Sequence, residues 1–472
     1  MHEQRRRWLA LTALCLGELL IVLDSTIVNV ALPSIRSDLG FADSTLVWVV
    51  NAFMLTFGGF LLLGGRLGDL FGGRKLFLTG IALFTLASLA CGLAQTPAQL
   101  IGARLLQGMT GAIVSAVALS LMVNLFPEPD ERAKAMGFYG FVMAAGGSAG
   151  VLIGGLVTGL FSWHWVFLIN VPIGITVFLL ARRLLPASTH TAPVVSLDIA
   201  GAATITLALM LAVYGVVEGN NAGWLSLQTL AVLGLAIVLM AAFLVIESRT
   251  AAPLVPLSLF RRRNTTVANV VGVLWAVAMF AWFFYAALYL QRVLGYTPLQ
   301  VGMAFLPTNL MMAVFSLGLS AKVVMRFGLR VPMVLGLALS AAGLALFALA
   351  PVAGEFVSHV LPGMLLLGIG TGLAFNPVLL AAMGDVDESE SGLASGVVNT
   401  SFMMGGALGL AVVVALAVAV TSSAQAGGAA ALAALNSGYQ AAFWAGAVCA
   451  ALAAFIALAL REAPLRTGMG AH

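Results

Sequence analysis

Charged residues are scarce in this chain of 472 residues, and the scarcity excludes a soluble protein. Asp, Glu, Lys and Arg make up 8% of the positions, whereas a soluble globular domain has about 25%. Hydrophobic residues make up 61%, and the mean hydropathy is +1.07. Apolar runs of about 20 residues, each long enough to cross a ~30 Å hydrocarbon core, recur along the whole length. The sequence therefore predicts an integral membrane protein whose surroundings are a lipid bilayer.

Cysteine and histidine are also few, and their positions argue against a metal site or an enzyme. Cys15, Cys91 and Cys449 lie within apolar runs, which is typical of small core residues rather than of disulfides or metal ligands. The five histidines are scattered through termini and loops. No Walker-type phosphate loop occurs in the sequence, which disfavours an ATP-driven pump. We expect no catalytic residue, no metal and no cofactor.

Hydropathy and helix breakers mark fourteen membrane spans. The first follows MHEQRRR and is too long for the hydrophobic part of a signal peptide. The seventh and eighth spans occupy a region that would otherwise be a soluble linker between two halves of the chain. The spans lie at roughly 8–32, 45–63, 76–94, 99–125, 134–158, 165–185, 196–217, 227–246, 265–290, 300–321, 331–350, 356–380, 392–420 and 440–460.

The basic residues indicate which end of each span faces the cytoplasm, because Lys and Arg concentrate on that side of a membrane. With the N-terminus inside, all but three of the 22 basic residues fall on cytoplasmic segments. Arg36 and Arg292 lie outside, and Arg104 lies within a span. This distribution explains the net charge of +4 without a nucleic-acid partner. It predicts a multi-pass protein of the cell membrane with both termini in the cytoplasm.

The second half of the sequence repeats features of the first. RLLQGMTGA at 104–112 is similar to MLLLGIGTG at 364–372, and LFGGR at 70–74 is similar to RFGLR at 326–330. The offsets are 260 and 256 residues, so six spans recur as six. Parallel repeats of this kind are typical of secondary transporters in which two bundles rock about a site at mid-membrane.

Five stretches resemble signatures of the major facilitator superfamily, and in particular of its fourteen-span drug:proton antiporter branch. GRLGDLFGGRK at 65–75 is similar to the cytoplasmic loop between the second and third helices. LDSTIVNVALPSI at 23–35 and RLLQGMTGA resemble motifs of the first and fourth helices. WHWVFLINVPIG at 163–174 and GYTPLQVGMAFLP at 295–307 resemble the starts of the sixth helix and of the second bundle.

The resemblance implies an all-α membrane protein with the major facilitator superfamily fold and 14 transmembrane helices. Residues 1–187 would form an N-terminal six-helix bundle, 188–262 two additional linker helices, and 263–472 a C-terminal six-helix bundle. We expect the protein to act as a monomer on a small hydrophobic or cationic substrate. The proton gradient would supply the energy.

The resemblance makes the charged, glycine-rich stretch at 65–75 a cytoplasmic gate. The stretch matches the family signature at Gly65, Leu67, Asp69, Gly72 and Arg74. The candidate gate residues are Gly65, Arg66, Asp69, Gly72 and Arg74. Glycine allows a tight turn and a close approach of helices. Asp69 is placed to face the partial positive charge of a helix start, so we expect it to latch the bundles together near the start of the thirteenth span. The alternatives are that Asp69 is a solvated surface charge and that the bases only anchor the topology.

Small residues are concentrated in the fifth span, at Gly146, Gly150, Gly154 and Gly155 among other positions. Close spacing of small residues lets helix backbones pack tightly. The antiporter motif has Gly-Pro where this chain has Gly150-Val151, so the bend that proline imposes is not specified here. A mechanistic hinge and simple tight packing both stay open for these glycines.

Three ionisable residues lie well within spans, where each costs about 2.5–3.5 kcal/mol and is usually functional. Asp24 and Arg104 lie about 12 Å and about 8 Å inside the outer ends of the first and fourth spans, so a pair between them is feasible. Glu18 lies close to mid-membrane with no base at its depth, which favours its protonated form and makes it a candidate proton carrier. The structural alternatives are a snorkelling or helix-bonded Glu18 and a purely structural Asp24–Arg104 clasp.

Polar and aromatic residues at membrane depth are candidates for lining a substrate cavity. An aromatic, Met-rich cavity suits bulky lipophilic compounds, including cations that pair with Glu18 or Asp24. Asn309 and Asn376 each lie near a proline, where unwound backbone often lines a site. The candidate cavity residues are Asn51, Gln107, Trp282, Tyr285, Asn309, Asn376 and Asn399.

Together these features predict a secondary active transporter that exports hydrophobic drugs or antibiotics in exchange for protons. The alternative is a narrow-specificity carrier or an importer of a small organic solute, which the missing proline after Gly150 favours. A channel would not need two repeated bundles with a cytoplasmic latch.

Overall fold

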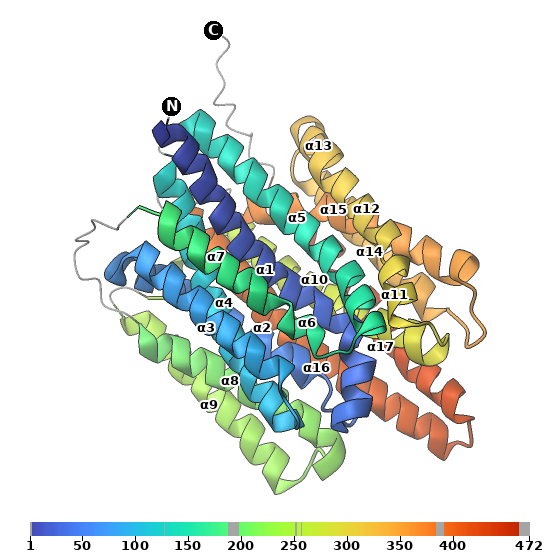
Figure 1. Ribbon diagram of the computed structural model, residues 1–472. Coiled ribbons are helices and arrows are strands. Elements are labelled where there is room, and N and C mark those ends of the chain that lie inside the picture. Colours follow the sequence, from blue (N-terminus) through green and yellow to red (C-terminus); the bar gives the residue numbers. More distant parts are fainter. Residues whose placement is uncertain are drawn as a thin grey trace.

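The computed structural model describes residues 2–126, 128–186, 198–250, 253–255, 257–383 and 391–461. Helices and the turns between them account for these residues, and no strand occurs among them. Figure 1 shows the long helices running side by side. The prediction of an all-α protein is thereby confirmed.

The N-terminal helices run in sequence order up to residue 184. They are α1 (His2–Leu39), α2 (Trp48–Phe71), α3 (Gly73–Gly92), α4 (Pro97–Leu125), α5 (Pro129–Leu160), the single turn α6 (Trp165–Leu168) and α7 (Asn170–Leu184). Two further helices follow and pack against each other as a hairpin. They are α8 (Ile199–Ala222) and α9 (Leu227–Arg249).

The C-terminal helices are more often interrupted. The first run is η1 (Leu257–Arg261), α10 (Arg263–Leu288), η2 (Tyr289–Val293), α11 (Pro298–Ala304), α12 (Leu306–Val314), η3 (Phe315–Leu319) and α13 (Ser320–Phe327). The second run is α14 (Arg330–Ala348), η4 (Phe356–Val360), α15 (Leu361–Met383), α16 (Ser391–Ala426) and α17 (Ala431–Ala457). The segments η2, η3 and η4 are π-helical turns.

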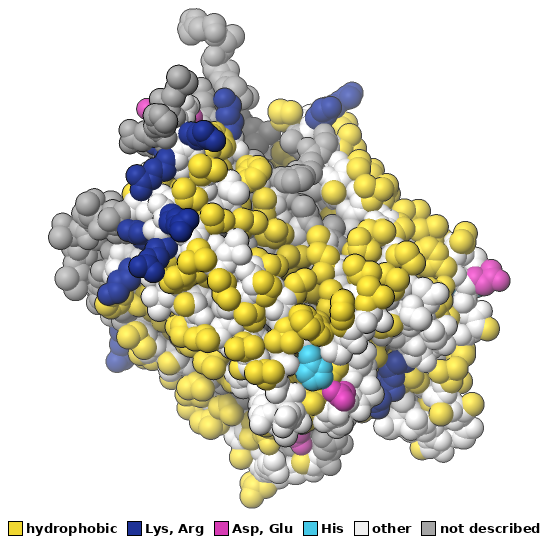
Figure 2. Space-filling view, in the orientation of Figure 1, with side chains coloured by type: hydrophobic (Ala, Val, Ile, Leu, Met, Phe, Trp, Pro, Cys, Tyr) yellow, Lys and Arg dark blue, Asp and Glu magenta, His cyan; other side chains and the backbone are white. Residues whose placement is uncertain are grey.

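Many of these helices have the length and composition of membrane spans. Within the described residues, eleven helices are long and apolar enough to cross a membrane. Three shorter apolar helices accompany them, at Trp48–Leu61, Ala149–Leu160 and Pro298–Val314. Figure 2 shows an extensive hydrophobic surface, with Lys and Arg gathered toward the end of the molecule at which α1 begins. The chain is a multi-span helical membrane protein.

Capping side chains fix where several helices begin. Thr96 accepts a hydrogen bond from the backbone N–H of Gln99, and Pro97 occupies the start of α4. Thr297 and Gln300 form a reciprocal capping box at the start of α11. These side chains satisfy backbone N–H groups that the first helical turn leaves without partners.

The helices form two groups that meet along a limited set of contacts. Helices α1–α7 pack mainly among themselves, and so do α10–α17. The α8–α9 hairpin touches both groups, because α8 packs on α2 and on α16. The groups also meet where α2 contacts α16 and where α5 contacts α11. Figure 1 shows α5 and α13 diverging toward the end of the molecule at which α1 begins.

The sequence repeat is visible as matching backbone geometry. Gly72 (φ 86°) and Gly328 (φ 75°) each separate two helices in a conformation that only glycine adopts readily. Gly108 of α4 lies against the backbone of α2, and Gly368 of α15 lies against the backbone of α12. The fourth predicted span thus meets the second in one half, as the twelfth meets the tenth in the other.

Two local predictions were wrong. α2 continues to Phe71, so 65–71 is helical and the turn predicted there is reduced to Gly72. α15 runs through Pro377 without interruption, so backbone is not unwound beside Asn376. The end of α2 was misplaced because hydropathy marks the apolar part of a helix and not its end. The helix α15 continues through Pro377 because neighbouring helices in a packed bundle can satisfy the backbone carbonyl that proline leaves without a partner. Near Pro307 the chain is indeed interrupted, at Phe305.

The glycines of the fifth predicted span lie at close helix crossings. A Cβ at Gly146 would lie 2.8 Å from Leu19, and one at Gly154 would lie 2.7 Å from the carbonyl oxygen of Ile27. Gly150 likewise faces α1, so this row of small residues seats α5 on α1. Gly155 faces the other half of the molecule, where it meets α11. α5 continues through Gly150-Val151 without interruption.

Candidate functional site

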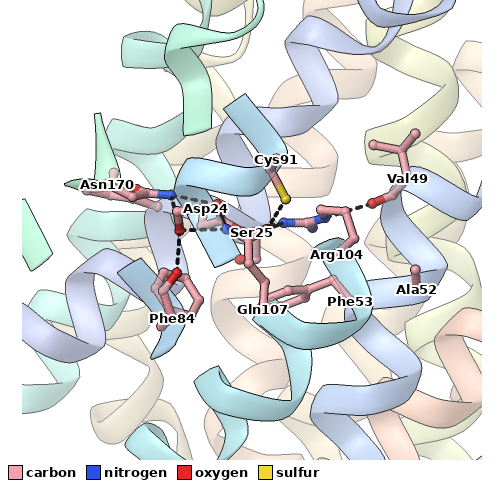
Figure 3. A network of polar contacts seen from close by, with 12 residues as sticks. Asp24, Ser25, Val49, Ala52, Phe53, Phe84, Cys91, Arg104, Gln107 and Asn170 are labelled. Carbon is pink, nitrogen blue, oxygen red and sulfur yellow. Dashed lines mark hydrogen bonds and ion pairs between the residues drawn. The ribbon is translucent and has the colours of Figure 1, made fainter. Parts of the chain in front are cut away.

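Asp24 of α1 and Arg104 of α4 form a buried ion pair, as their predicted depths suggest. Arg104 Nη1 donates to Asp24 Oδ2, and the side chains are 1% and 0% exposed, respectively. Arg104 Nε donates to the carbonyl oxygen of Val49 in α2 at 2.9 Å. The guanidinium also lies 4.5 Å from the ring centroid of Phe53. Figure 3 shows Arg104 between these partners.

Polar side chains from two further helices complete the surroundings of Asp24. Gln107 Nε2 and Asn170 Nδ2 both donate to Asp24 Oδ1, at 3.0 Å and 2.7 Å. Gln107 Nε2 also donates to Ser88 Oγ at 2.8 Å, and Cys91 Sγ donates to Gln107 Oε1 at 3.1 Å. Residues of α4 and α7 therefore meet at one carboxylate of α1, and two residues of α3 bond to Gln107 (Figure 3).

The network satisfies Asp24 as an anion. Both of its oxygens accept hydrogen bonds, and one of those bonds comes from a cation. Charge-assisted hydrogen bonds of this kind are the strong ones in proteins. Breaking such a buried pair leaves a charge without a partner, which typically costs 3–5 kcal/mol.

Asn170 and Ser88 are network members that the sequence reading missed. Asn170 lies in the stretch WHWVFLINVPIG, where a single Asn within an apolar run was the available signal. Ser88 gave no signal, because serine in an apolar helix can satisfy itself on its own backbone. It does donate to the carbonyl oxygen of Phe84 at 2.8 Å.

Glu18 occupies a second buried site on α1. The residue is 1% exposed, and its Oε1 accepts a hydrogen bond from Ser115 Oγ of α4 at 2.5 Å. The Tyr139 hydroxyl of α5 also lies close to this side chain. Within the described residues Oε2 has no hydrogen-bond partner. The site surrounds Glu18 with hydroxyl groups, and the cation of the first site lies elsewhere.

The two acids are six residues apart on α1, which corresponds to about 9 Å of helix rise. They belong to separate networks, because no side chain among the described residues bonds to both. One acid is paired with a cation and amides, and the other contacts neutral hydroxyls. A contrast of environments between two acids is a common way to assign them different protonation states.

The structure describes only part of the predicted cytoplasmic gate. The side chains of Gly65, Arg66 and Asp69 lie outside what is described, and so does the predicted contact of Asp69 near residue 392. Arg74 Nη2 donates to the carbonyl oxygen of Arg182 at 2.5 Å, which joins the start of α3 to the end of α7. A cation at a helix C-terminus is favourably placed.

The three candidate cavity residues that are not asparagines form defined contacts inside the molecule. Gln107 belongs to the Asp24 network. The ring of Trp282 packs 5.3 Å from that of Phe305. The ring of Tyr285 packs 5.1 Å from that of Tyr439.

The candidate asparagines differ from one another. Asn51 Nδ2 donates to the carbonyl oxygen of Ala407 at 2.9 Å, which links α2 to α16. Asn376 Nδ2 donates to the carbonyl oxygen of Ser316 at 3.2 Å. Asn309 is buried, with no partner for its Nδ2 among the described residues. Asn399 is exposed.

At one end of the molecule, polar side chains join the two groups of helices. Gln291 Nε2 donates to the carbonyl oxygen of Val30 at 2.8 Å. Arg292 Nη1 donates to Asp43 Oδ1 and to the hydroxyl of Tyr439. Close to this end, Gly155 of α5 packs against the backbone of Gly302 in α11. The two halves are therefore closed against each other on the side that the topology predicts to be outer.

Comparison with known proteins identifies the family. Residues 14–410 match the model of the Major Facilitator Superfamily. The chain belongs to the Major Facilitator Superfamily, and it is a transporter.

Several relatives have names that refer to antibiotics. The chain is 39% identical to the puromycin resistance protein pur8 of Streptomyces alboniger, over 89% of this chain and 83% of that protein. It is 38% identical to the cephamycin export protein CmcT of Amycolatopsis lactamdurans, over 88% of this chain and 86% of that protein. It is 33% identical to the tetracenomycin C resistance and export protein of Streptomyces glaucescens, over 86% and 75%.

Solved structures show the same fold at low sequence identity. A bacterial homologue of the human lysosomal transporter Spinster, in an inward-facing conformation, aligns with a TM-score of 0.69 at 16% identity. That alignment covers 97% of each chain. The nucleoside transporter NupG aligns with a TM-score of 0.68 at 13% identity, over 96% of this chain and 99% of that one.

Proposed function

We propose that this transporter exports hydrophobic antibiotics or related small molecules across the cell membrane in exchange for protons. The names of relatives at 33–39% identity support a drug-like substrate. The buried acids on α1 support proton coupling, because ionisable residues at membrane depth are usually functional. No resident cofactor is needed, since the proton gradient supplies the energy.

The proposed topology has fourteen spans, with both termini in the cytoplasm. One helix, or one interrupted run of helices, corresponds to each of the fourteen predicted spans. In this arrangement residues 1–187 and 263–472 are the two six-helix bundles, and 188–262 supplies the linker pair. The gathering of Lys and Arg at the end where α1 begins supports the orientation. We infer that a monomer suffices, because the proposed site lies within one chain.

The observation that carries the proton-coupling proposal is the contrast between Glu18 and Asp24. Asp24 is held as an anion by Arg104 and two amides. Glu18 has a hydroxyl on one oxygen and an unpartnered second oxygen among the described residues. An ionised carboxylate oxygen needs a hydrogen-bond donor, and Oε2 has none among the described residues. A proton bound to the Glu18 carboxyl group removes that need, so this site is suited to take up and release a proton.

The structure suggests how that proton is linked to movement. The halves are closed at the predicted outer end, whereas α5 and α13 diverge toward the other. We propose that this arrangement is an inward-facing state, which would receive substrate from the cytoplasm. Rocking about α5–α11 and α2–α16 would open the outer end, and protonation of Glu18 there would favour substrate release and return. Each positive charge that enters gains about 2.3 kcal/mol per 100 mV.

A narrower specificity is the second candidate. Each of the relatives described above is named for a single antibiotic, and Val151 replaces the proline of the antiporter motif. A narrow exporter would move one compound of a panel and exclude the others.

Efflux from cells and from proteoliposomes tests the proposal. Cells that express the protein would be loaded with puromycin, lincomycin, a cephamycin, tetracenomycin C and cationic dyes in turn. We expect efflux of at least one compound that stops when a protonophore collapses the gradient. Efflux that persists without a gradient would contradict proton coupling, and inward movement down the proton gradient would contradict export.

A further inference from the structure

Asp198 and Glu247 bring two buried carboxyl groups together in the α8–α9 hairpin, away from the α1 sites. Asp198 is the N-cap of α8 and is 6% exposed, and Glu247 lies in the last turns of α9 and is 3% exposed. The two side chains lie within hydrogen-bonding reach of each other. Neither residue was singled out from the sequence, because acids near span ends normally face water.

Each carboxyl group uses one oxygen to satisfy the backbone. Asp198 Oδ1 accepts from the N–H of Gly201 at 2.7 Å. Glu247 Oε2 accepts from the N–H of Val255 at 3.2 Å. The other two oxygens, Asp198 Oδ2 and Glu247 Oε1, are buried and have no hydrogen-bond partner among the described residues.

The two unpartnered oxygens converge on the same small space. A Cβ added at Gly201 would meet both of them, with Glu247 Oε1 only 2.9 Å away. The glycine therefore leaves room for the carboxyl groups to approach. Two carboxylates at this distance and burial repel each other, whereas one carboxylic acid and one carboxylate make a strong hydrogen bond. A single proton satisfies both oxygens at once, since one then donates and the other accepts.

Within the described part of the chain, neither carboxyl group takes part in an ion pair. Asp198 is the described charged side chain that acts on Glu247. Arg249, two residues further along α9, is exposed. A cluster of apolar side chains packs here from α2 and from the turn after α9: Phe60, Leu63, Leu67, Leu254 and Val255. The partial positive charge at the start of α8 stabilises one negative charge on the pair and not two.

We infer that Asp198 and Glu247 form a proton-binding site that fastens the linker hairpin to α2. The proton holds the carboxyl groups together, Glu247 holds Val255, and the turn carrying Leu254 and Val255 packs on Leu63. This turn leads into the C-terminal helices, and α2 carries the gate stretch 65–75. The site therefore links α2 to the turn that leads into the C-terminal helices, at the predicted cytoplasmic end.

Stability measured as a function of pH tests the site without any need for transport. In the unfolded chain an ordinary Glu loses its proton near pH 4.3, whereas the folded pair keeps one proton above that pH. The folded state then binds more protons than the unfolded state, so stability falls as pH rises. The window runs from about pH 4.3 to the pH at which the folded pair loses its proton. Within it, the unfolding equilibrium constant increases by up to tenfold per pH unit.

The variant Glu247→Gln supplies the donor permanently, because its amide can donate to the Asp198 carboxylate. Melting of the purified full-length protein in detergent would be followed between pH 5 and 8.5. We expect the melting temperature of Glu247→Gln, relative to the parent, to rise steadily with pH. Asp198→Asn, which keeps a capping oxygen, should behave in the same way. Glu218→Gln, on the other end of α8, should shift the melting temperature by a constant amount.

Two results would overturn the inference. One is a difference between Glu247→Gln and the parent that does not change with pH, which would indicate a purely structural acid. The other is a parent stability that depends on the concentration of sodium or magnesium at fixed pH, which would indicate a metal cation between the carboxylates. Because the readout is melting, neither result depends on whether the protein exports antibiotics.

Discussion

Asp43 and Arg292, which lie 249 positions apart, are joined by a hydrogen bond of 2.8 Å between Oδ1 and Nη1. Asp43 follows α1, and Arg292 lies in the π-helical turn after α10, so the bond connects the two halves of the molecule. Arg36 also pairs with Asp43, but from the same half. The two bases predicted to lie on the outer side of the membrane thus meet at one acid.

Removing this link should favour opening of the outer end. Asp43 is 38% exposed, and partly exposed pairs contribute about 1 kcal/mol or less, so Arg292→Gln should shift the conformational equilibrium by at most about fivefold. Spin labels at Gln95 and Ser358, on a background without the native cysteines, would report the distance between the halves. We expect a larger long-distance population in the variant.

Arg36→Gln is the matched control for that measurement. It removes the positive charge of Arg36 next to Asp43 but leaves the bond between Asp43 and Arg292, which joins the halves. The distance distribution should therefore resemble that of the parent. Equal shifts in both variants would show that Asp43 only needs positive charge nearby, and that the bond to Arg292 does not hold the halves together.

The crossing of α5 and α11 should tolerate no side chain at Gly155. A Cβ added there would clash with the carbonyl oxygen of Pro298 and lie 3.2 Å from the Cα of Gly302, and overpacking typically costs 1–3 kcal/mol. Because this contact joins the two halves, Gly155→Val should impede closure of the outer end and reduce transport severalfold. Efflux rates normalised to the amount of folded protein would measure the effect.

Gly147 offers a control on the same helix. A Cβ there would meet nothing within 4 Å, and alanine is the better helix former by about 1 kcal/mol. Gly147→Ala should leave both transport and melting temperature unchanged or slightly raised. Full transport in Gly155→Val would show that the close crossing is not required for the cycle.

Arg104 should be needed for stability as well as for any role in transport. Arg104→Gln leaves the Asp24 carboxylate buried without its cation, which predicts destabilisation of about 3–5 kcal/mol. Arg104→Lys should rescue only in part, because one ammonium cannot reproduce the separate bonds of Nε to Val49 and Nη1 to Asp24. Melting of the purified variants would measure both, with the exposed Lys75→Gln as control. A melting temperature for Arg104→Gln equal to that of the parent would contradict a buried, charged pair.

The sequence was most informative where a charge lies in an apolar run. Asp24, Arg104 and Glu18 are conspicuous because ionised groups in hydrocarbon are costly, and helix rise alone placed the first two at matching depths. Asn170 and Ser88 were missed because neutral polar side chains can be accommodated on their own helix. Asp198 and Glu247 were missed because nothing in the chain shows that the ends of α8 and α9 fold against each other.

The positions of helix ends were also beyond a hydropathy argument. The helix α2 continues through the polar stretch to Phe71. It can do so because charged residues are compatible with a helix outside the apolar layer. Gly72, which was expected within a longer turn, is the one residue between α2 and α3. The repeat was predictable because its glycines are required by the close approach of backbones, which leaves them in matching positions in both halves.

The proposed role of Glu18, as the carrier of the proton exchanged for substrate, can be tested directly in proteoliposomes. Proteoliposomes containing the parent, Glu18→Gln or Asp24→Asn would be given an acid step, and substrate movement would be followed with and without it. The parent should accumulate substrate in response to the step, whereas Glu18→Gln should still exchange labelled for unlabelled substrate but ignore the step. Proton-driven accumulation by Glu18→Gln at the rate of the parent would contradict the proposed role of Glu18.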